Sequence, residues 1–142
     1  KKPNVEIITQ SSSQGIQDLI DRGADLEAVT LFYLDAHWYD YLPLRHEYEL
    51  ICKNFKRPII VVDDFRVEGD DGYTFAAYDD DVLALEYMTR PEDKFGAHIF
   101  FPTTPAHKES GARTGYVVVT TDNDLAGIIM ANIPLLRSFV QR

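Results

Sequence analysis

Two apolar runs of strand length most restrict what this chain can form. They cover residues 30–34 and 58–62, and each ends abruptly at acidic residues. The segment 44–55 between them carries apolar residues at the spacing of a helix with one buried face, and Pro43 suits its first turn. Because strands joined through a helix are usually parallel neighbours in one sheet, the pattern predicts a parallel β–α–β unit.

The segments before and after this unit extend it to one α/β domain. Residues 5–9 predict a further strand, and the serines at 11–13 begin a helix that Gly23 ends. Asp79 is expected to cap a helix over residues 82–87, and the last segment, 125–140, is helical by pattern with a break before Pro134.

The C-terminal part also contains two strand-like runs, HIFFP and GYVVVTT, at residues 98–102 and 115–121. The segment that joins them is rich in turn residues and predicts no helix, so the two strands should be antiparallel. We therefore expect a single α/β domain over residues 1–142, with a Rossmann-like, mostly parallel sheet flanked by helices and an antiparallel C-terminal hairpin.

Composition excludes several classes of partner. The chain has 14 basic and 23 acidic residues, a net charge of −9, and no basic run interleaved with aromatic residues, so nucleic acid is not an expected partner. No apolar stretch reaches the roughly 18 residues of a membrane span. The single cysteine, Cys52, excludes an intramolecular disulfide and suits a reducing compartment. We expect a cytoplasmic protein with a small-molecule substrate, and self-association stays open.

The acidic residues at the two strand ends are the candidate functional residues. Asp35 and His37 follow the first apolar run, and Asp63 with Asp64 follow the second. Parallel strands deliver their carboxyl ends to one edge, where α/β proteins bind ligands. An oxygen-rich set of this kind suits Mg²⁺, Ca²⁺ or Mn²⁺. Adjacent strand residues point to opposite faces, so only one of the two adjacent acids need face the site unless the backbone bends.

Each of these residues also has a purely structural interpretation. Asp63 and Asp64 could be solvated residues at a strand end, and His37 could be an imidazole packed against Trp38 or Tyr39. His37 could equally serve as a general base, because its ordinary pKa near 6.5 suits that role. Residues 65–78 form a polar, glycine-containing segment, which is typical of a loop over a site. Tyr78, at the end of this segment, is one of several tyrosines that could line a pocket.

The combined motifs resemble a known family. The segments LFYLDAHWYDYLPLRHEYELI, RPIIVVDDFRV and GARTGYVVV are similar to the C-terminal half of class I S-adenosylmethionine-dependent methyltransferases, and most similar to the metal-assisted O-methyltransferase-like group encoded near sugar and antibiotic biosynthesis enzymes. The resemblance implies that Asp35, Asp63 and Asp64 bind Mg²⁺, which orients a substrate hydroxyl for methyl transfer. It also assigns His37 and Asp35 to catalysis, and Gln10, Ser11 and Asp35 to the cofactor.

The resemblance also implies that parts of the family's fold precede Lys1. The glycine-rich turn for the methionine part of the cofactor, and the acid for its ribose, do not occur in these residues. We therefore expect the N-terminal strands of the fold to be missing, residues 5–9 to pair directly with residues 30–34, and the chain alone to bind S-adenosylmethionine poorly and be inactive.

Three functions follow from these observations. The first is an S-adenosylmethionine-dependent O-methyltransferase, of which this chain carries the metal and substrate side, acting on a small-molecule or sugar hydroxyl. The second is a non-catalytic α/β interaction module that retains the methyltransferase fold. The third is a metal-dependent hydrolase or phosphotransferase, which ranks last because the chain has no glycine-rich phosphate-binding loop.

Overall fold

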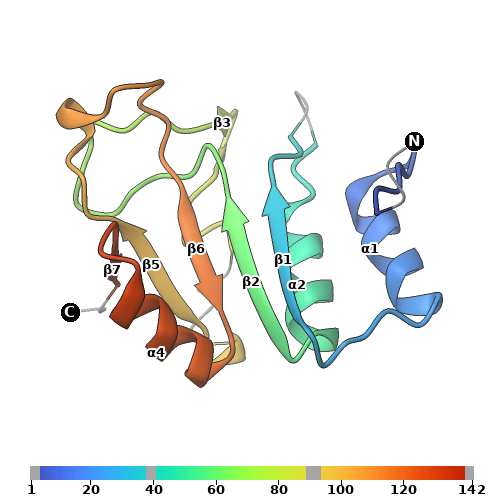
Figure 1. Ribbon diagram of the computed structural model, residues 1–142. Helices are drawn as coiled ribbons and strands as arrows, with labels where there is room; N and C mark the ends of the chain where they lie inside the picture. Colours follow the sequence, from blue (N-terminus) through green and yellow to red (C-terminus); the bar gives the residue numbers. More distant parts are fainter. Residues whose placement is uncertain (1–3, 38–40, 89–93, 140–142) are drawn as a thin grey trace.

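A five-stranded sheet is the centre of the structure, a computed structural model that describes residues 4–37, 41–88 and 94–139. Figure 1 shows its strands side by side, with helices on both sides. The order across the sheet is β1 (Val29–Leu34), β2 (Arg57–Val62), β6 (Val117–Thr120), β5 (His98–Pro102) and β7 (Leu136–Ser138).

The first two strands form the predicted β–α–β unit. β1 and β2 are parallel neighbours, with Leu34 opposite Val62 at their carboxyl ends, and α2 (Leu44–Asn54) lies between them in the chain. β6 is antiparallel to both β2 and β5, as predicted for the strands at 98–102 and 115–121. The α/β prediction is thus confirmed. Within the described residues, however, β1 and β2 are the only parallel pair, so the sheet is mixed and mostly antiparallel.

The two faces of the sheet bury separate clusters, because successive strand residues point to opposite sides. The larger cluster lies on the α2 side and includes Phe32, Leu34, Tyr48, Ile51, Ile60, Val62, Val119 and Phe101. The smaller cluster lies under α4 (Asn123–Asn132) and consists of Phe100, Val118, Ala126 and Ile129. Burial of large apolar side chains at roughly 1.5–3 kcal/mol each makes the larger cluster the main source of stability.

The α4 side of β1 is open to solvent. Val29, Leu31 and Tyr33 alternate along the strand and are 49%, 65% and 60% exposed. Their neighbours Phe32 and Leu34 point to the other face and are buried. The apolar run in the sequence is therefore a strand with one buried face.

The predicted strand at residues 5–9 is wrong. These residues form no strand, Ile7 is 88% exposed and Val5 is 50% exposed, and β1 pairs only with β2 among the described residues. The predicted direct pairing with residues 30–34 is therefore wrong as well. β-branched residues favour a strand only where a neighbouring strand supplies hydrogen bonds and packing.

The helix predicted after Ser11–Ser13 is confirmed as α1 (Ser12–Asp21), with the Ser11 hydroxyl as its N-cap. It packs against α2 through buried Ile16. Figure 1 shows both helices beside the β1 end of the sheet. In the part of the chain that the structure describes, no helix has the length and apolar composition needed to cross a bilayer.

The helix predicted over residues 82–87 is wrong. Two short strands, β3 (Ala77–Tyr78) and β4 (Asp81–Val82), form a hairpin whose turn places Asp79 at φ +49°, and turns follow to residue 88. Asp79 thus supplies a left-handed turn residue and caps no helix. The backbone at Leu83 is held by distant partners, since its N–H donates to Ala76 and its carbonyl accepts from Arg66.

The predicted C-terminal helix is correct only in its first part. α4 ends at Asn132, before the predicted break at Pro134, and the chain then returns as β7, antiparallel to β5. β7 is three residues long and half exposed, so its sequence has too few positions to show an alternating pattern. A one-turn 3₁₀ helix, η1 (Ala106–Lys108), interrupts the connection between β5 and β6.

Candidate functional site

The carboxyl ends of β1 and β2 meet at one edge of the sheet. Leu34 and Val62 are opposite each other, and the backbone N–H of Asp63 donates to the carbonyl of Leu34 over 3.0 Å, which continues the ladder past the strand ends. Asp35 follows β1 and Asp63 follows β2 directly. The predicted common edge is therefore present.

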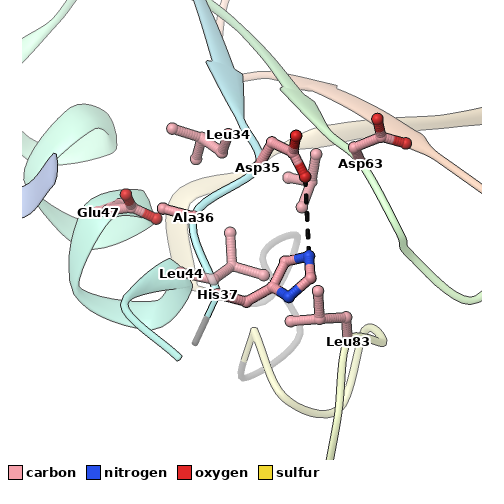
Figure 2. Close-up of a pocket in the computed structure, with 9 residues that line it drawn as sticks. Leu34, Asp35, Ala36, His37, Leu44, Glu47, Asp63 and Leu83 are labelled. Carbon is pink, nitrogen blue, oxygen red and sulfur yellow. Dashed lines mark ion pairs between the residues drawn. The ribbon is translucent and has the colours of Figure 1, made fainter. Parts of the chain in front are cut away.

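Three side chains converge at this edge, namely Asp35, His37 and Asp64. One ligand atom from each lies within 4.8 Å of the other two. Nε2 of His37 is 2.9 Å from Oδ2 of Asp64 and 3.7 Å from Oδ1 of Asp35, and Figure 2 shows the second of these contacts. The side chain of His37 is 19% exposed, whereas that of Asp35 is 53% exposed. The cluster is thus open to solvent on the side of Asp35.

Asp63 and Asp64 separate because the backbone bends between them. Asp64 has φ +52°, a left-handed backbone conformation that is uncommon for residues other than glycine, although asparagine and aspartate adopt it more often than most. Oδ1 of Asp63 accepts the N–H of Asp64 over 2.9 Å, and Oδ2 accepts the hydroxyl of Tyr33. Figure 2 shows Asp63 directed away from His37. The structure therefore brings Asp64, and not Asp63, to the other predicted residues.

The hydrogen bond between Tyr33 and Asp63 affects the tyrosine. The carboxylate of Asp63 favours the protonated phenol, and with partial burial and the nearby acids it raises the pKa of Tyr33 to about 12. Tyr33 was not among the predicted site residues. The signal available in the sequence was its position two residues before Asp35, which places the two side chains on the same side of an extended chain.

His37 is held from its other side by Tyr78. Nδ1 of His37 lies 2.5 Å from the hydroxyl of Tyr78, which belongs to β3 at the end of the segment predicted as a loop over the site. With the phenol O–H donating to Nδ1, the N–H at Nε2 donates to Asp64; with Nδ1 protonated, Nε2 presents a lone pair to the acids. Trp38 and Tyr39, the predicted packing partners of His37, lie outside the described residues.

A small pocket of about 10 Å³ lies beside the cluster. That volume is about what one water molecule needs. Figure 2 shows the residues around it, which come from the ends of β1 and β2, from α2 and from the turn after β4: Leu34, Asp35, Ala36, His37, Leu44, Glu47, Val62, Asp63 and Leu83.

Glu47 is the unexpected residue of this pocket. It is 1% exposed, and neither carboxylate oxygen has a hydrogen-bond partner of good geometry among the described residues. Burial raises the pKa of Glu47, and the nearby hydroxyl of Ser12 offsets this effect only in part. The sequence offered a signal, because position 47 falls between Leu44 and Ile51 on the apolar face of α2.

The two residues predicted to contact the cofactor are engaged in α1. Nε2 of Gln10 donates to Asp18 over 2.7 Å, and the hydroxyl of Ser11 accepts the N–H of Gln14. Neither residue lines the pocket beside the cluster. Their present role is to fix the beginning of the helix.

Comparison with protein-family models, curated proteins and solved structures finds no match for this chain. The chemistry of the site therefore has to be argued from its own residues. Two carboxylates and one imidazole within 4.8 Å are a donor set that fits a divalent cation, and the carboxylates favour Mg²⁺ or Mn²⁺.

Proposed function

We propose that this chain supplies the metal and substrate side of an S-adenosylmethionine-dependent O-methyltransferase that acts on a small-molecule or sugar hydroxyl. The observation that carries the proposal is the convergence of Asp35, His37 and Asp64 at the carboxyl ends of two parallel strands. The resemblance of the surrounding sequence to that family supports the assignment of methyl transfer.

The three side chains have distinct roles in this proposal. Asp35 and Asp64 would hold Mg²⁺ or Mn²⁺ with carboxylate oxygens, and Nε2 of His37 would be the third ligand. Such a cation lowers the pKa of a bound hydroxyl and fixes its orientation. Asp35 is the most exposed of the three, so the acceptor would approach from its side.

His37 is better placed to bind a cation than to act as a general base. With the N–H at Nδ1 donating to the hydroxyl of Tyr78, Nε2 has a lone pair directed at Asp35 and Asp64, where the proposed cation would lie, so a bound cation would occupy the nitrogen that a general base would use. Histidine ligands of metals commonly use their second nitrogen to bind a neighbouring polar group, which fixes the ring. Tyr78 is in the position to do this for His37.

The cation part of the proposal is tested by thermal unfolding with and without Mg²⁺. At about 100-fold above its Kd, a ligand stabilises the folded state by about 2.7 kcal/mol, which for a chain of this size raises Tm by roughly 5–10 °C. We expect this shift in the native chain and its loss in Asp35→Asn and Asp64→Asn. Asp80→Asn, an exposed change of the same charge, should retain it.

A second candidate function is the non-catalytic interaction module. The observation that favours it is the hydrogen-bonded chain from Tyr78 through His37 to Asp64, which is complete without an ion. A module of this kind should show no Mg²⁺-dependent shift in Tm, and Asp35→Asn should leave its stability unchanged or raise it, because one of two neighbouring negative charges is removed.

The cofactor part is tested separately by calorimetric titration with S-adenosylmethionine. We expect binding weaker than the low-micromolar range, because the side chain of Gln10 is bonded to Asp18, Ser11 caps α1, and no glycine-rich turn is present in the sequence. Low-micromolar binding by this chain would contradict the assignment of the metal and substrate side alone.

A further inference from the structure

Glu47 is a buried carboxyl group that the structure leaves without sufficient compensation. It is 1% exposed, both oxygens lack a hydrogen-bond partner of good geometry among the described residues, and it lies in the first turn of α2. An ionised carboxylate removed from water costs several kcal/mol unless hydrogen bonds or an opposite charge replace the lost hydration. A water molecule or an ion bound beside such a carboxylate can supply the missing hydrogen bonds or charge.

The position of Glu47 indicates what that partner is. It lines the same pocket as Asp35 and His37, two of the three residues of the proposed cation site. Figure 2 shows the carboxylate of Glu47 extending from α2 towards Ala36, which lies between Asp35 and His37 in the sequence. The pocket has about the volume that one water molecule needs.

Direct coordination by Glu47 does not fit the geometry. The ligand atoms within 4.8 Å of one another belong to Asp35, His37 and Asp64, and Glu47 is not among them. A water molecule in the pocket could join Glu47 to the cation, because a bound cation polarises its waters and makes them strong hydrogen-bond donors. The carboxylate of Glu47 can accept such a bond, since neither of its oxygens has a hydrogen-bond partner of good geometry among the described residues.

We propose that Glu47 is a positioning residue of the cation site, whose carboxylate accepts a hydrogen bond from a water on the divalent cation held by Asp35, His37 and Asp64. The inference rests on the proposed function, since it requires the cation. It adds a residue from α2 to a site otherwise built from the ends of β1 and β2. Groups that support metal ligands in this way typically change metal affinity 10- to 100-fold when they are removed.

Titration with Mn²⁺, followed by the electron paramagnetic resonance signal of the free ion, tests this inference. Glu47→Gln keeps the shape of the side chain and removes its charge, and we expect it to bind Mn²⁺ roughly 10- to 100-fold more weakly than the native chain. Glu49→Gln is the matched control: it lies on the same helix, changes the net charge equally and pairs with Lys94 and Lys53 away from the pocket. Its affinity should stay within about twofold of the native value.

Stability without metal separates this role from a structural one. In the presence of a chelator, Glu47→Gln should unfold at the same or a higher temperature than the native chain, because the buried charge is gone. Glu47→Met, an apolar side chain of similar length, should do the same and lose the same Mn²⁺ affinity. It replaces Glu47→Gln in the comparison if that variant does not fold.

The outcomes are distinct. If the native chain binds Mn²⁺, Asp64→Asn does not, and Glu47→Gln binds as well as Glu49→Gln, the role of Glu47 is wrong and the cation site stands. If the native chain does not bind Mn²⁺ at all, the cation site itself fails and the role of Glu47 fails with it.

Discussion

The hydroxyl of Tyr33 on β1 donates a hydrogen bond to Asp63 at the end of the neighbouring strand β2. Both oxygens of Asp63 are then occupied, because the second accepts the N–H of Asp64. This contact separates two adjacent acids that the sequence does not distinguish. Asp63 is held on the Tyr33 side, and Asp64 is free to face His37.

The raised pKa of Tyr33 provides a test of this contact. Asp63→Asn removes the charge that disfavours the phenolate, so the pKa of Tyr33 should fall from about 12 towards its usual value near 10. A raised pKa in the folded state stabilises the protein below pH 10, and this contribution is lost as the pH rises from about 10 to about 12. Ultraviolet absorbance titration measures the change, and Tyr33→Phe identifies the signal.

The matched control for this experiment is Asp80→Asn, which removes one exposed charge at another place in the chain. It should leave the titration of Tyr33 unchanged. If Asp63→Asn also leaves the pKa of Tyr33 unchanged, then the hydrogen bond from Tyr33 to Asp63 does not form in solution.

The alternation along β1 predicts unequal costs for neighbouring substitutions. Phe32 is 9% exposed and packs edge-on against Phe55 with ring centroids 4.8 Å apart, so Phe32→Ala should lower the free energy of unfolding by about 3–5 kcal/mol. Leu31 is 65% exposed, and Leu31→Ala should cost less than about 1 kcal/mol. Urea unfolding measures both. Equal costs would mean that the exposed face of β1 is covered in solution.

Gly115 is required by a close approach of two segments. A Cβ at this position would lie 2.2 Å from the carbonyl oxygen of Phe65 and 2.9 Å from Cγ2 of Val67. The two segments are also joined by the hydrogen bond from the N–H of Phe65 to the carbonyl of Gly115. Because the backbone has to move, Gly115→Ala should destabilise the protein by about 1–3 kcal/mol or more.

Gly127→Ala is the control for that substitution. Gly127 lies inside α4, and a Cβ there would meet nothing within 4 Å. Alanine is the better helix residue, so this variant should be more stable by about 0.5–1 kcal/mol. Thermal unfolding of the two variants should therefore shift in opposite directions, and a loss of stability in both would contradict the open surroundings of Gly127.

Asp122 combines a helix cap with an ion pair. Its Oδ1 accepts the N–H of Leu125 over 2.9 Å, its Oδ2 accepts Nε of Arg57 over 2.8 Å, and these contacts lower its pKa. A lowered pKa stabilises the folded state above the usual value near 3.8, and the contribution is lost as the pH falls below it. Asp122→Ala should therefore cost about 1–2 kcal/mol near neutral pH, with a smaller difference at about pH 3.

Urea unfolding at the two pH values measures this effect. Asp122→Asn separates the two contacts, because an asparagine still caps the helix but carries no charge for Arg57. Its loss of stability near neutral pH should be smaller than that of the alanine variant. A loss that is independent of pH in Asp122→Ala would show that the charge of Asp122 contributes nothing.

Elements with a strong local pattern were predicted well from the sequence. The apolar runs that became β1, β2, β5 and β6, and the amphipathic helix α2, carry their period in enough consecutive residues to be recognised. The failures at residues 5–9 and 82–87 have a different origin. The first has strand composition but no neighbouring strand among the described residues. The second has apolar residues at helical spacing, but its backbone groups at Leu83 pair with Ala76 and Arg66.

By itself the sequence determined that two neighbouring strands end in acids, because the apolar pattern that makes a strand also shows where it stops. Only the tertiary structure decided which acid faces His37, since that choice depends on the left-handed backbone of Asp64 and on the hydroxyl that Tyr33 donates from the next strand. The sequence named Tyr78 among several tyrosines that could line a pocket, but its contact with His37, and the presence of Glu47 beside the site, were likewise tertiary results. Residues that are distant along the chain meet through packing, and the local pattern of apolar residues does not show which distant residues will come into contact.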